Sequence, residues 1–306
     1  MGYFLNKTTG ICLAALLAGL LWCVRSEGAS SAITAGAFAS YPVSVRGAGM
    51  GGAYAAIAER NGAPYHNPAW MGFADLHSVG VSYADLNSLG LVRNIYLDYV
   101  QPDKGYGASG LYWNWRGTEV EGPGGVGELG YAENTLCYAI GKRVGRYLAV
   151  GAAAKAYFIT TDIEDTGGKG GGLDLALYAT PDPFSTVAFV VRNALSKVAW
   201  DTGLKDNLPL ELEIGGSYYV LDELVVVVEI RYERNHYSAF TLGGEYTVKP
   251  ELFFIRGGLT RRFDRTSPSF GLGFRLDKIR IDYAAEIDPG NSGLGTTHKL
   301  GMSLDF

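Results

Sequence analysis

Cysteine is scarce in this sequence, and its placement limits the chemistry that the chain can use. Three cysteines occur among 306 residues, and Cys12 and Cys23 lie in a segment that we expect to be removed. Cys137 would then be the sole thiol of the mature protein, and a single thiol cannot form an internal disulfide. The cysteines therefore give no support to a disulfide-stabilised fold.

Catalytic and metal-binding motifs are also missing. The four histidines stand at positions 66, 77, 236 and 298 and show no metal-ligand spacing. No Gly-x-Ser-x-Gly element and no convincing Ser/His/Asp set is present. We expect no metal, no cofactor and no enzyme activity, although a triad scattered along the chain would leave no such pattern and keeps an enzyme as the third alternative.

Long apolar runs are absent beyond the N-terminus. The runs Ala53–Ala58, Val187–Val191 and Leu224–Val228 are far too short for a membrane helix. If the protein spans a membrane, it must do so as a closed barrel, since only helices and closed barrels satisfy every backbone polar group in lipid. The formal net charge of −5 and the lack of a basic cluster argue against a nucleic-acid partner.

The N-terminus has the organisation of an export signal. Lys7 supplies a positive charge, Ile11–Val24 an apolar stretch, and Ser30-Ser31-Ala32 a plausible cleavage site. We therefore expect a removable signal peptide over residues 1–32, an N-terminal segment over 33–77 and a barrel over 78–306. This organisation predicts export to the lipid of the outer membrane of a Gram-negative-type bacterium.

What the chain has in abundance is alternation of apolar and polar residues. In the segment 278–287 one face carries Ile279, Ile281 and Tyr283, whereas the other carries Arg280 and Asp282. Successive side chains of a strand point to opposite faces, so such a strand is apolar on one side and ionic on the other. The 43 glycines, the 20 tyrosines and the mean hydropathy of +0.06 suit an outer-membrane barrel with aromatic girdles.

The alternation predicts about fourteen strands, an even number as single-chain barrels require. We expect them at residues 78–86, 92–100, 106–116, 128–141, 147–160, 171–179, 186–194, 209–220, 223–233, 237–248, 251–262, 267–276, 278–287 and 296–306.

Short and long connections alternate between these strands. Every second one is tight, as at Pro102–Gly105 and Leu221-Asp222, and the intervening ones are often longer. Barrels of the outer membrane have short periplasmic turns and longer outer loops. The longer connections are expected at Gly117–Gly127, Thr161–Gly170, Leu195–Leu208 and Asp288–Gly295.

The polar faces of the predicted strands should line the lumen. We interpret their mixed charges first as ion pairs that stabilise the barrel wall. The alternative is a polar constriction that filters what passes through the lumen. These inward charges are Glu211, Glu213, Glu229, Arg231, Glu233, Glu245, Arg256, Arg275, Arg280, Asp282, Glu286 and Lys299. The last strand ends on Phe306, through which we expect the barrel-assembly machinery to engage the chain.

A glycine-rich segment precedes the first strand. Gly47, Gly49 and Gly52 spell a dinucleotide fingerprint, but no βαβ unit surrounds them, so we set that interpretation aside. Small residues instead favour a short helix that can approach other backbones closely. Asn67-Pro68 should then hold an extended or turn conformation.

The stretch "SVRGAGMGGAYAAIAERNGAPYHNPAWMG" resembles the opening of PorV/PorQ-type outer-membrane proteins, which are similar to the FadL-like fatty-acid channels. "GLGFRLDKIRIDYAAEI" and "THKLGMSLDF" have the same character. The chain departs from the family pattern at Glu59-Arg60, the usual place of two aspartates, and at Trp70, the usual place of glycine.

The resemblance implies an all-β fold: a transmembrane antiparallel β-barrel of fourteen strands with a small N-terminal helical hatch in its lumen. It also implies that the hatch residues are Arg46, Gly49, Met50, Gly51, Gly52 and Ala53, anchored by Asn67, Pro68 and Ala69. Met50, Tyr54 and Ile57 are expected to be close to any ligand, because they could line an apolar pocket.

Two functions follow from the resemblance. The first is a channel or binding protein for small hydrophobic or amphipathic compounds. The second is the outer-membrane component of a type IX-like secretion system that holds or delivers secreted cargo proteins. We favour the channel because it requires no partner protein, and the inward charges argue only mildly against an apolar tunnel.

Overall fold

The computed structural model describes residues 41–86, 88, 90–121, 128–163, 166–233, 237–262, 265–287 and 295–306. The predicted signal peptide and the start of the predicted hatch, residues 33–40, lie outside this described part. Sixteen strands form one sheet. Their bounds are β1 Ser78–Leu86, β2 Val92–Gln101, β3 Ala108–Glu121, β4 Glu128–Arg143, β5 Leu148–Thr161, β6 Gly168–Asp182, β7 Ser185–Arg192, β8 Lys197–Trp200, β9 Lys205–Asn207, β10 Glu211–Leu221, β11 Leu224–Glu233, β12 Tyr237–Lys249, β13 Phe253–Arg262, β14 Arg265–Leu276, β15 Ile279–Glu286 and β16 Thr297–Asp305.

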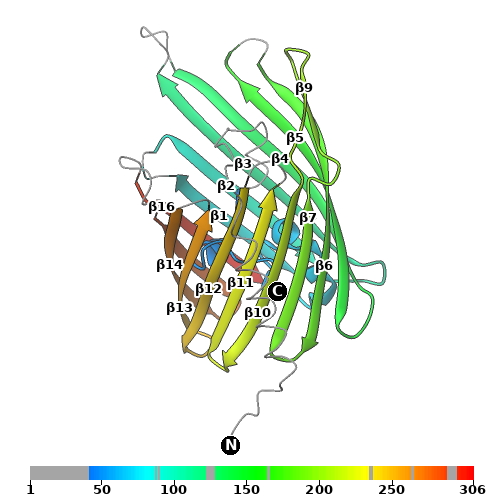
Figure 1. Cartoon of the computed structure of the whole chain (residues 1–306), viewed down its shortest axis with the longest axis vertical. Helices are drawn as coiled ribbons and strands as arrows, with labels where there is room; N and C mark the ends of the chain where they lie inside the picture. Colours follow the sequence, from blue (N-terminus) through cyan, green and yellow to red (C-terminus); the bar gives the residue numbers. More distant parts are fainter. Residues whose placement is uncertain are drawn as a thin grey trace, which may run out of the picture.

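Fourteen of these strands close into an antiparallel barrel (Figure 1). Each barrel strand pairs with its sequence neighbours, except that β7 pairs with β10 across the β8–β9 hairpin. The first and last strands also pair, with Ser78 opposite Asp305 and Asp85 opposite His298. Closure leaves no free edge in the ring, and thus every strand has a partner on both sides. The predicted fourteen-strand barrel is confirmed.

Side chains alternate along the strands as the sequence predicts. The exposed face carries large apolar residues such as Leu111, Leu300 and Met302, each more than half exposed. Residues of the opposite face, such as Arg256 and Lys299, are buried inside the ring. The barrel therefore has an apolar outer wall and a charged inner wall.

One predicted connection proved to contain strands. The expected loop Leu195–Leu208 folds into the β8–β9 hairpin, and β8 pairs with β6 beside the ring. The hairpin is stabilised by the buried side chain of Val198 and by a 2.7 Å hydrogen bond from Trp200 Nε1 to Asp206 Oδ2. Gly203 takes a positive φ in its turn. The strand pattern over residues 197–200 is too short to distinguish from a loop by sequence.

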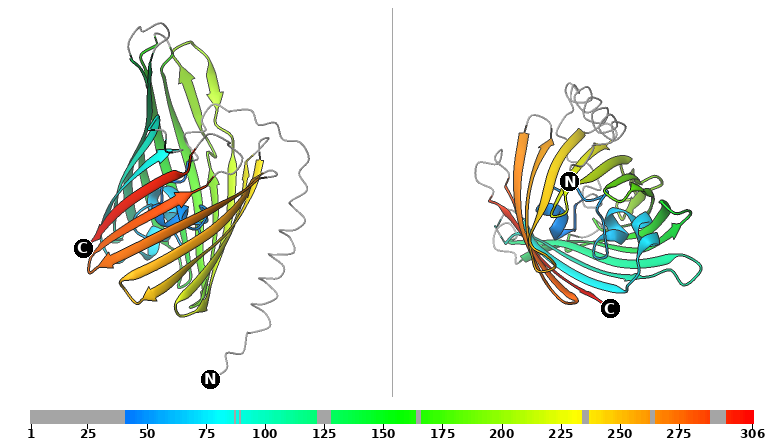
Figure 2. Two further views of the ribbon diagram at one scale, coloured as in Figure 1. Left: turned by 90° about the vertical axis from the view of Figure 1, so that its left-hand side faces the viewer. Right: turned by 90° about the horizontal axis from the view of Figure 1, so that it is seen from below.

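Two further predicted loops are partly strand. The loop predicted at Gly117–Gly127 is partly strand, because β3 runs to Glu121, and β6 begins at Gly168 inside another predicted loop. The ladder extends on this side because β3, β4, β5 and β6 keep their pairing beyond the neighbouring strands. In Figure 2 these strands rise above the rest of the wall.

The hatch, described here over residues 41–77, lies inside the ring (Figure 2). It contains the helices α2 (Val45–Ala48) and α3 (Ala63–His66) and the 3-10 helix η2 (Pro68–Phe73). The expected single helix of small residues is instead interrupted, because Gly51 and Gly52 take positive φ values that end it after one turn. Within the described residues, the helices are too short and too polar to cross a membrane.

Glycines of the wall let the hatch backbone come close. A Cβ added to Gly258 or Gly243 would overlap with Met50, and one added to Gly151 would overlap with Ala69. A Cβ on Gly271 would lie 2.9 Å from the Cα of Gly49, a separation that real Cβ atoms essentially never show. Glycine at these wall positions thus serves packing against the hatch rather than strand formation.

This packing makes a direct prediction for Gly258. Its replacement by valine should displace the hatch around Met50 while leaving the barrel ladder closed, because the new side chain occupies the space of the Met50 backbone. Hydrogen exchange over residues 41–77 should rise by about tenfold or more, as expected for a loss of at least 1.4 kcal/mol.

The matched control is Gly257→Val on the same strand. Gly257 faces outward, and an added Cβ there meets nothing within 4 Å. Equal exchange in the two variants would contradict the packing role of Gly258.

Candidate functional site

The innermost anchor of the hatch is Arg192 at the end of β7. Its guanidinium donates to both carboxylate oxygens of Glu213 at 2.9 Å. Its two Nη atoms donate to the main-chain carbonyls of Tyr65 and His66 at 2.7 and 3.0 Å. A side chain that is only 2% exposed thus ties the end of α3 to the wall, and two-point pairing makes the geometry specific.

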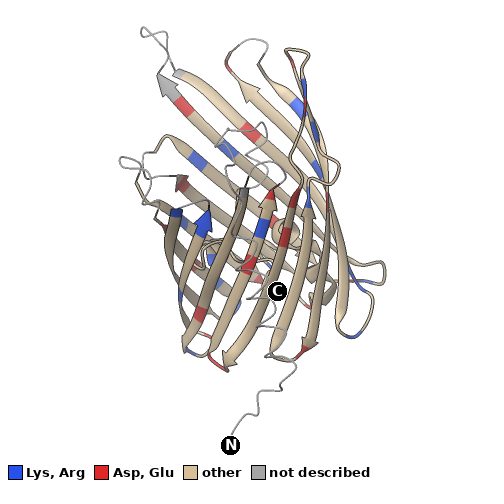
Figure 3. Ribbon diagram, in the orientation of Figure 1, with Lys and Arg blue, Asp and Glu red and all other residues tan. Residues whose placement is uncertain are grey.

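A second anchor uses a carboxylate instead of an arginine. Glu229 Oε2 accepts hydrogen bonds from the backbone N–H groups of Tyr54 and Ala55 at 3.0 and 2.9 Å. Arg231 lies 3.2 Å from the other oxygen of Glu229 and also pairs with Glu213 at 2.9 Å. In Figure 3 acidic and basic positions lie close together on neighbouring strands of the barrel wall.

The third anchor holds α2. Arg46 donates to both oxygens of Glu245 on β12, at 2.8 and 2.7 Å, and this carboxylate also accepts from Arg256 Nε at 2.6 Å. Burial works to lower the pKa of Arg46, but Glu245 and Glu59 more than offset it and hold the pKa above its ordinary value. Arg46 is therefore a permanent cation inside the barrel.

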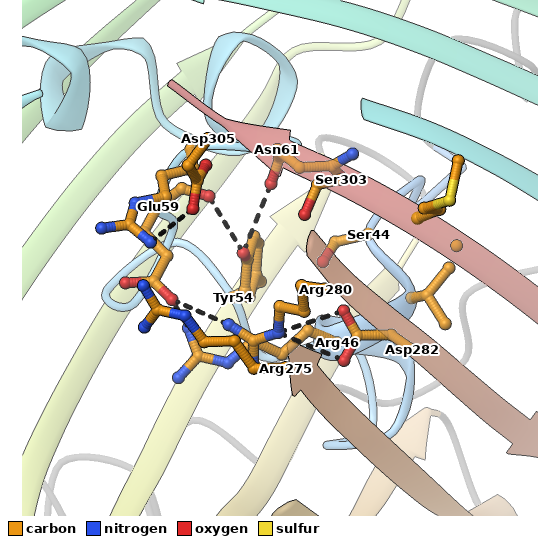
Figure 4. A pocket seen from close by; sticks show the side chains of 14 residues that line it. Ser44, Arg46, Tyr54, Glu59, Asn61, Arg275, Arg280, Asp282, Ser303 and Asp305 are labelled. Atoms are coloured by element: carbon orange, nitrogen blue, oxygen red, sulfur yellow. Dashed lines mark hydrogen bonds and ion pairs between the residues drawn. The ribbon is translucent and has the colours of Figure 1, made fainter. Parts of the chain in front are cut away.

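A polar pocket lies between the hatch and strands β14, β15 and β16 (Figure 4). Its volume is about 30 Å³, counted as space for the centre of a water-sized molecule. Because one water needs about 10–15 Å³ by this measure, the pocket has room for two or three waters. The lining residues are Ser44, Val45, Arg46, Tyr54, Glu59, Arg60, Asn61, Arg275, Arg280, Asp282, Gly301, Met302, Ser303 and Asp305.

Ion pairs join the hatch to the wall around this pocket. Arg60 pairs with Asp305 at 2.7 Å, and Glu59 bridges Arg46 at 2.6 Å and Arg280 at 3.2 Å. Burial acts to raise the pKa of Glu59, but Arg46 and Arg280 outweigh it and keep that pKa below its ordinary value. The side chains of Arg60 and Glu59 are 28% and 35% exposed, so water reaches this side of the hatch.

The remaining predicted residues occupy different parts of the hatch. Met50 and Ile57 pack with Val225 and Val227 of β11 and do not line the pocket. The carbonyl oxygen of Gly51 accepts a hydrogen bond from the Thr260 hydroxyl, which accounts for the approach of Gly51 to β13. The wall charges Glu211, Glu213, Glu229, Arg231, Glu245, Arg256 and Asp282 are all buried, and Arg275 and Arg280 reach the pocket. Proximity of these residues to a ligand stays a prediction.

Asn67 links the hatch to itself and to the wall. Its Oδ1 accepts from Ala69 N at 3.1 Å, which holds the turn into Pro68 and η2. Its Nδ2 donates to Ala55 O at 3.0 Å and to Leu177 O of β6 at 3.4 Å. The side chain is fully buried, so each bond forms without competition from water.

Several important residues were not predicted as site residues. Arg192, Arg60, Asn61, Asp305 and His66 carry contacts that the alternation pattern does not single out. Arg192 lies within the strand predicted at 186–194 beside apolar residues, and an isolated inward arginine there was the available signal. Glu59-Arg60 was noted only as a departure from the family pattern. Among the described residues, no group of three or more His, Cys, Asp or Glu is placed to hold a metal.

His66 is a neutral acceptor in the hatch core. The backbone N–H of Ser44 donates to its Nε2 at 3.1 Å, and its ring meets those of Tyr54 and Tyr65 edge-on. Burial lowers the pKa of His66 well below its ordinary value, and Arg192 lowers it further. The contact from Ser44 therefore requires the unprotonated ring.

Comparison with known proteins reveals likeness of fold without close sequence kinship. No family model and no curated protein matches the chain. The toluene transporter TbuX of Ralstonia pickettii superposes with a TM-score of 0.61 at 15% identity, over 85% of this chain and 96% of that one. The toluene transporter TodX of Pseudomonas putida gives 0.64 at 11%, over 85% and 97%.

A FadL homologue of Pseudomonas aeruginosa gives a TM-score of 0.63 at 12% identity, over 86% of this chain and 98% of that one. The chain shares their barrel fold. The likeness to FadL-type proteins that the sequence suggested is therefore present at the level of structure, whereas the narrower resemblance to PorV/PorQ-type proteins has no counterpart among these matches.

The state of His66 predicts a pH effect on hatch docking. Below about pH 6.5 a displaced hatch binds a proton at His66 that the docked hatch does not, so docking is fully stable above that pH and weakens as pH falls. The loss reaches at most about 1.4 kcal/mol for each pH unit. Hydrogen exchange of a peptide covering residues 41–48 should therefore accelerate between pH 6.5 and 5, after correction for intrinsic rates.

The control for this effect is His66→Gln, which keeps an acceptor but cannot titrate. The pKa of Glu59 is lowered in the docked hatch, so Glu59 weakens docking only as pH falls below about 4.5, its ordinary pKa. The effects of His66 and Glu59 on docking therefore occur in different pH ranges. An identical pH profile in wild type and His66→Gln would refute the assignment to His66.

Asn67 supports a second prediction. Asn67→Ala should loosen the hatch by about 1–3 kcal/mol, because the Ala69 N–H and the Ala55 carbonyl lose a buried partner. The barrel should remain folded, since its ladder closes without Asn67. The effect is measured as the hydrogen-exchange rates of the hatch in Asn67→Ala compared with those in Asp75→Ala, a control at an exposed residue. Equal rates in the two variants would count against the role of Asn67.

Proposed function

We propose that the chain forms an outer-membrane channel for small hydrophobic or amphipathic compounds. The observation that carries this proposal is a hatch-filled barrel that matches toluene transporters over nearly their whole length. An apolar outer face supports placement in a membrane, because lipid requires apolar side chains around the ring. The predicted export signal supports the outer membrane as its location.

The structure corresponds to a closed channel in this proposal. The pocket of about 30 Å³ is far smaller than the cavity of about 150 Å³ that benzene occupies in a protein core. A monoaromatic molecule therefore does not fit this pocket unless the hatch moves. Transport then consists of entry into the lumen, displacement of part of the hatch, and release at the end where β16 terminates.

The anchors indicate which part of the hatch moves. Breaking a buried pair such as Arg192–Glu213 leaves an uncompensated charge and costs about 3–5 kcal/mol. A solvated pair contributes about 0–1 kcal/mol, and the Arg60–Asp305 pair is closer to that limit because water reaches Arg60. Release should begin at Arg60 and Glu59 on the pocket side, and freeing α2 further requires separation of the buried Arg46–Glu245 pair, with the Arg192 side as the fixed end.

The other expectations are weaker. No observation in the described residues favours the secretion component over the channel, and the matched structures are transport proteins, which fits a chain without enzyme activity. Interaction of the C-terminal strand with the assembly machinery remains a prediction. Phe306 is half exposed and stacks on His77, with ring centroids 5.6 Å apart.

A disulfide between α2 and β16 tests the channel. A Cβ on Gly301 would lie 3.3 Å from the Cβ of Val45, close to the separation of about 3.5–4.5 Å in disulfides. Oxidised Val45→Cys/Gly301→Cys should block uptake of radiolabelled toluene into outer-membrane vesicles carrying the protein, because the hatch cannot leave β16. Reduction should restore uptake to the level of the reduced variant before oxidation.

The two single-cysteine variants control for the substitutions themselves, and vesicles without the protein give the background. Wild-type uptake at that background would contradict the channel proposal. Uptake through the oxidised double variant at the wild-type rate would contradict the requirement for hatch movement near β16.

A further inference from the structure

The charges around the polar pocket do not balance. The residues that line the pocket, together with the ion-pair partners of these residues, contain one more guanidinium group than carboxylates. The guanidinium groups belong to Arg46, Arg60, Arg256, Arg275 and Arg280, and the carboxylates to Glu59, Glu245, Asp282 and Asp305. The cluster therefore carries a net charge of one positive unit when all members are ionised.

The unmatched group is Arg275. The other four arginines each lie within 3.5 Å of at least one carboxylate oxygen. Within the described part of the chain, Arg275 forms no ion pair with a carboxylate, although its charge acts on Asp305 from a distance, and its Nε donates to the Asp277 carbonyl at 3.3 Å. Because that bond uses Nε, the two Nη atoms of the guanidinium group remain available to donate to a ligand.

Arg275 also reaches into the cavity. Figure 4 places its guanidinium beside those of Arg46 and Arg280, in the space between the hatch and β14. Like charges gathered in a partly enclosed space repel, and an anion between them relieves that repulsion. The geometry combines an unpaired cation with a cavity large enough for a small ion.

We propose that this pocket binds one small monovalent anion, chloride or a small carboxylate such as formate, against the guanidinium of Arg275. A single negative charge balances the cluster, whereas a divalent anion would reverse its sign. The volume of about 30 Å³ admits an ion of this size and excludes an amphiphile with its apolar tail. The binding is independent of whether the barrel transports hydrophobic compounds.

The side chains around the site define its selectivity. Glu59, Asp282 and Asp305 each form an ion pair with another arginine, and of these three carboxylates Asp305 also interacts with the charge of Arg275, without an ion pair between them. Val45 gives the lining an apolar side chain, which limits the number of waters that accompany the ion. A hydrogen bond from a guanidinium to an anion is charge-assisted and therefore stronger than a bond between neutral groups.

Chloride-35 magnetic resonance of the purified full-length protein in a non-ionic detergent tests the proposal. Bound chloride relaxes rapidly, so a site in exchange broadens the bulk signal in a saturable manner, and added formate should reverse the broadening. Arg275→Gln should weaken chloride binding by about tenfold or more, because a charge-assisted bond is lost. Arg275→Lys should restore part of it.

Arg265→Gln is the matched control, since Arg265 is exposed at the opposite end of the same strand. It should leave chloride binding unchanged. Circular dichroism verifies that each variant keeps the barrel. Wild-type protein without saturable, formate-reversible broadening would overturn the proposal, as would equal broadening in Arg275→Gln. Equal losses in both glutamine variants would trace the effect to overall charge and also overturn it.

Discussion

Charged side chains that the barrel turns inward must find partners once the hatch fills the lumen. A closed ring of strands satisfies its own backbone, but it leaves a buried layer of carboxylates and guanidinium groups. Glu229 and Arg192 meet this need by bonding to backbone groups of the hatch, and Glu245 meets it by two-point pairing with the side chain of Arg46 in the hatch. The inner wall and the hatch therefore specify each other.

Alternation, taken together with the predicted export signal and the alternation of short and long connections, was sufficient to predict the barrel. The period of two sorts each strand into an apolar and a polar face, and hence bounds such as 78–86 and 224–233 fall within a residue or two of the predicted ones. The inward placement of Glu245 and Arg256 follows from the same period. Ring closure follows because a sheet in lipid cannot leave an edge unpaired.

The path of the hatch was beyond the reach of the pattern. Its course depends on glycines of distant strands, since Gly258 and Gly151 leave space for Met50 and Ala69 only after the barrel has closed. Long-range pairs such as Arg60 with Asp305 depend in the same way on tertiary structure. The β8–β9 hairpin was missed because each of its strands is too short to show a period.

The two sides of the hatch differ in their access to water, and this difference gives the molecule a direction of opening. On the Arg192 side the carboxylate and the guanidinium have no solvent to replace their partner, so separation costs several kcal/mol. On the pocket side Arg60 and Glu59 can exchange the wall for water at little cost. In the proposed channel, a hatch fixed at the Arg192 end and released at the pocket end swings away from β14–β16, and Arg275 adds a positive charge to the opening. In the proposed channel, a compound that leaves by this route would pass a polar surface, which favours amphipathic molecules over purely apolar ones.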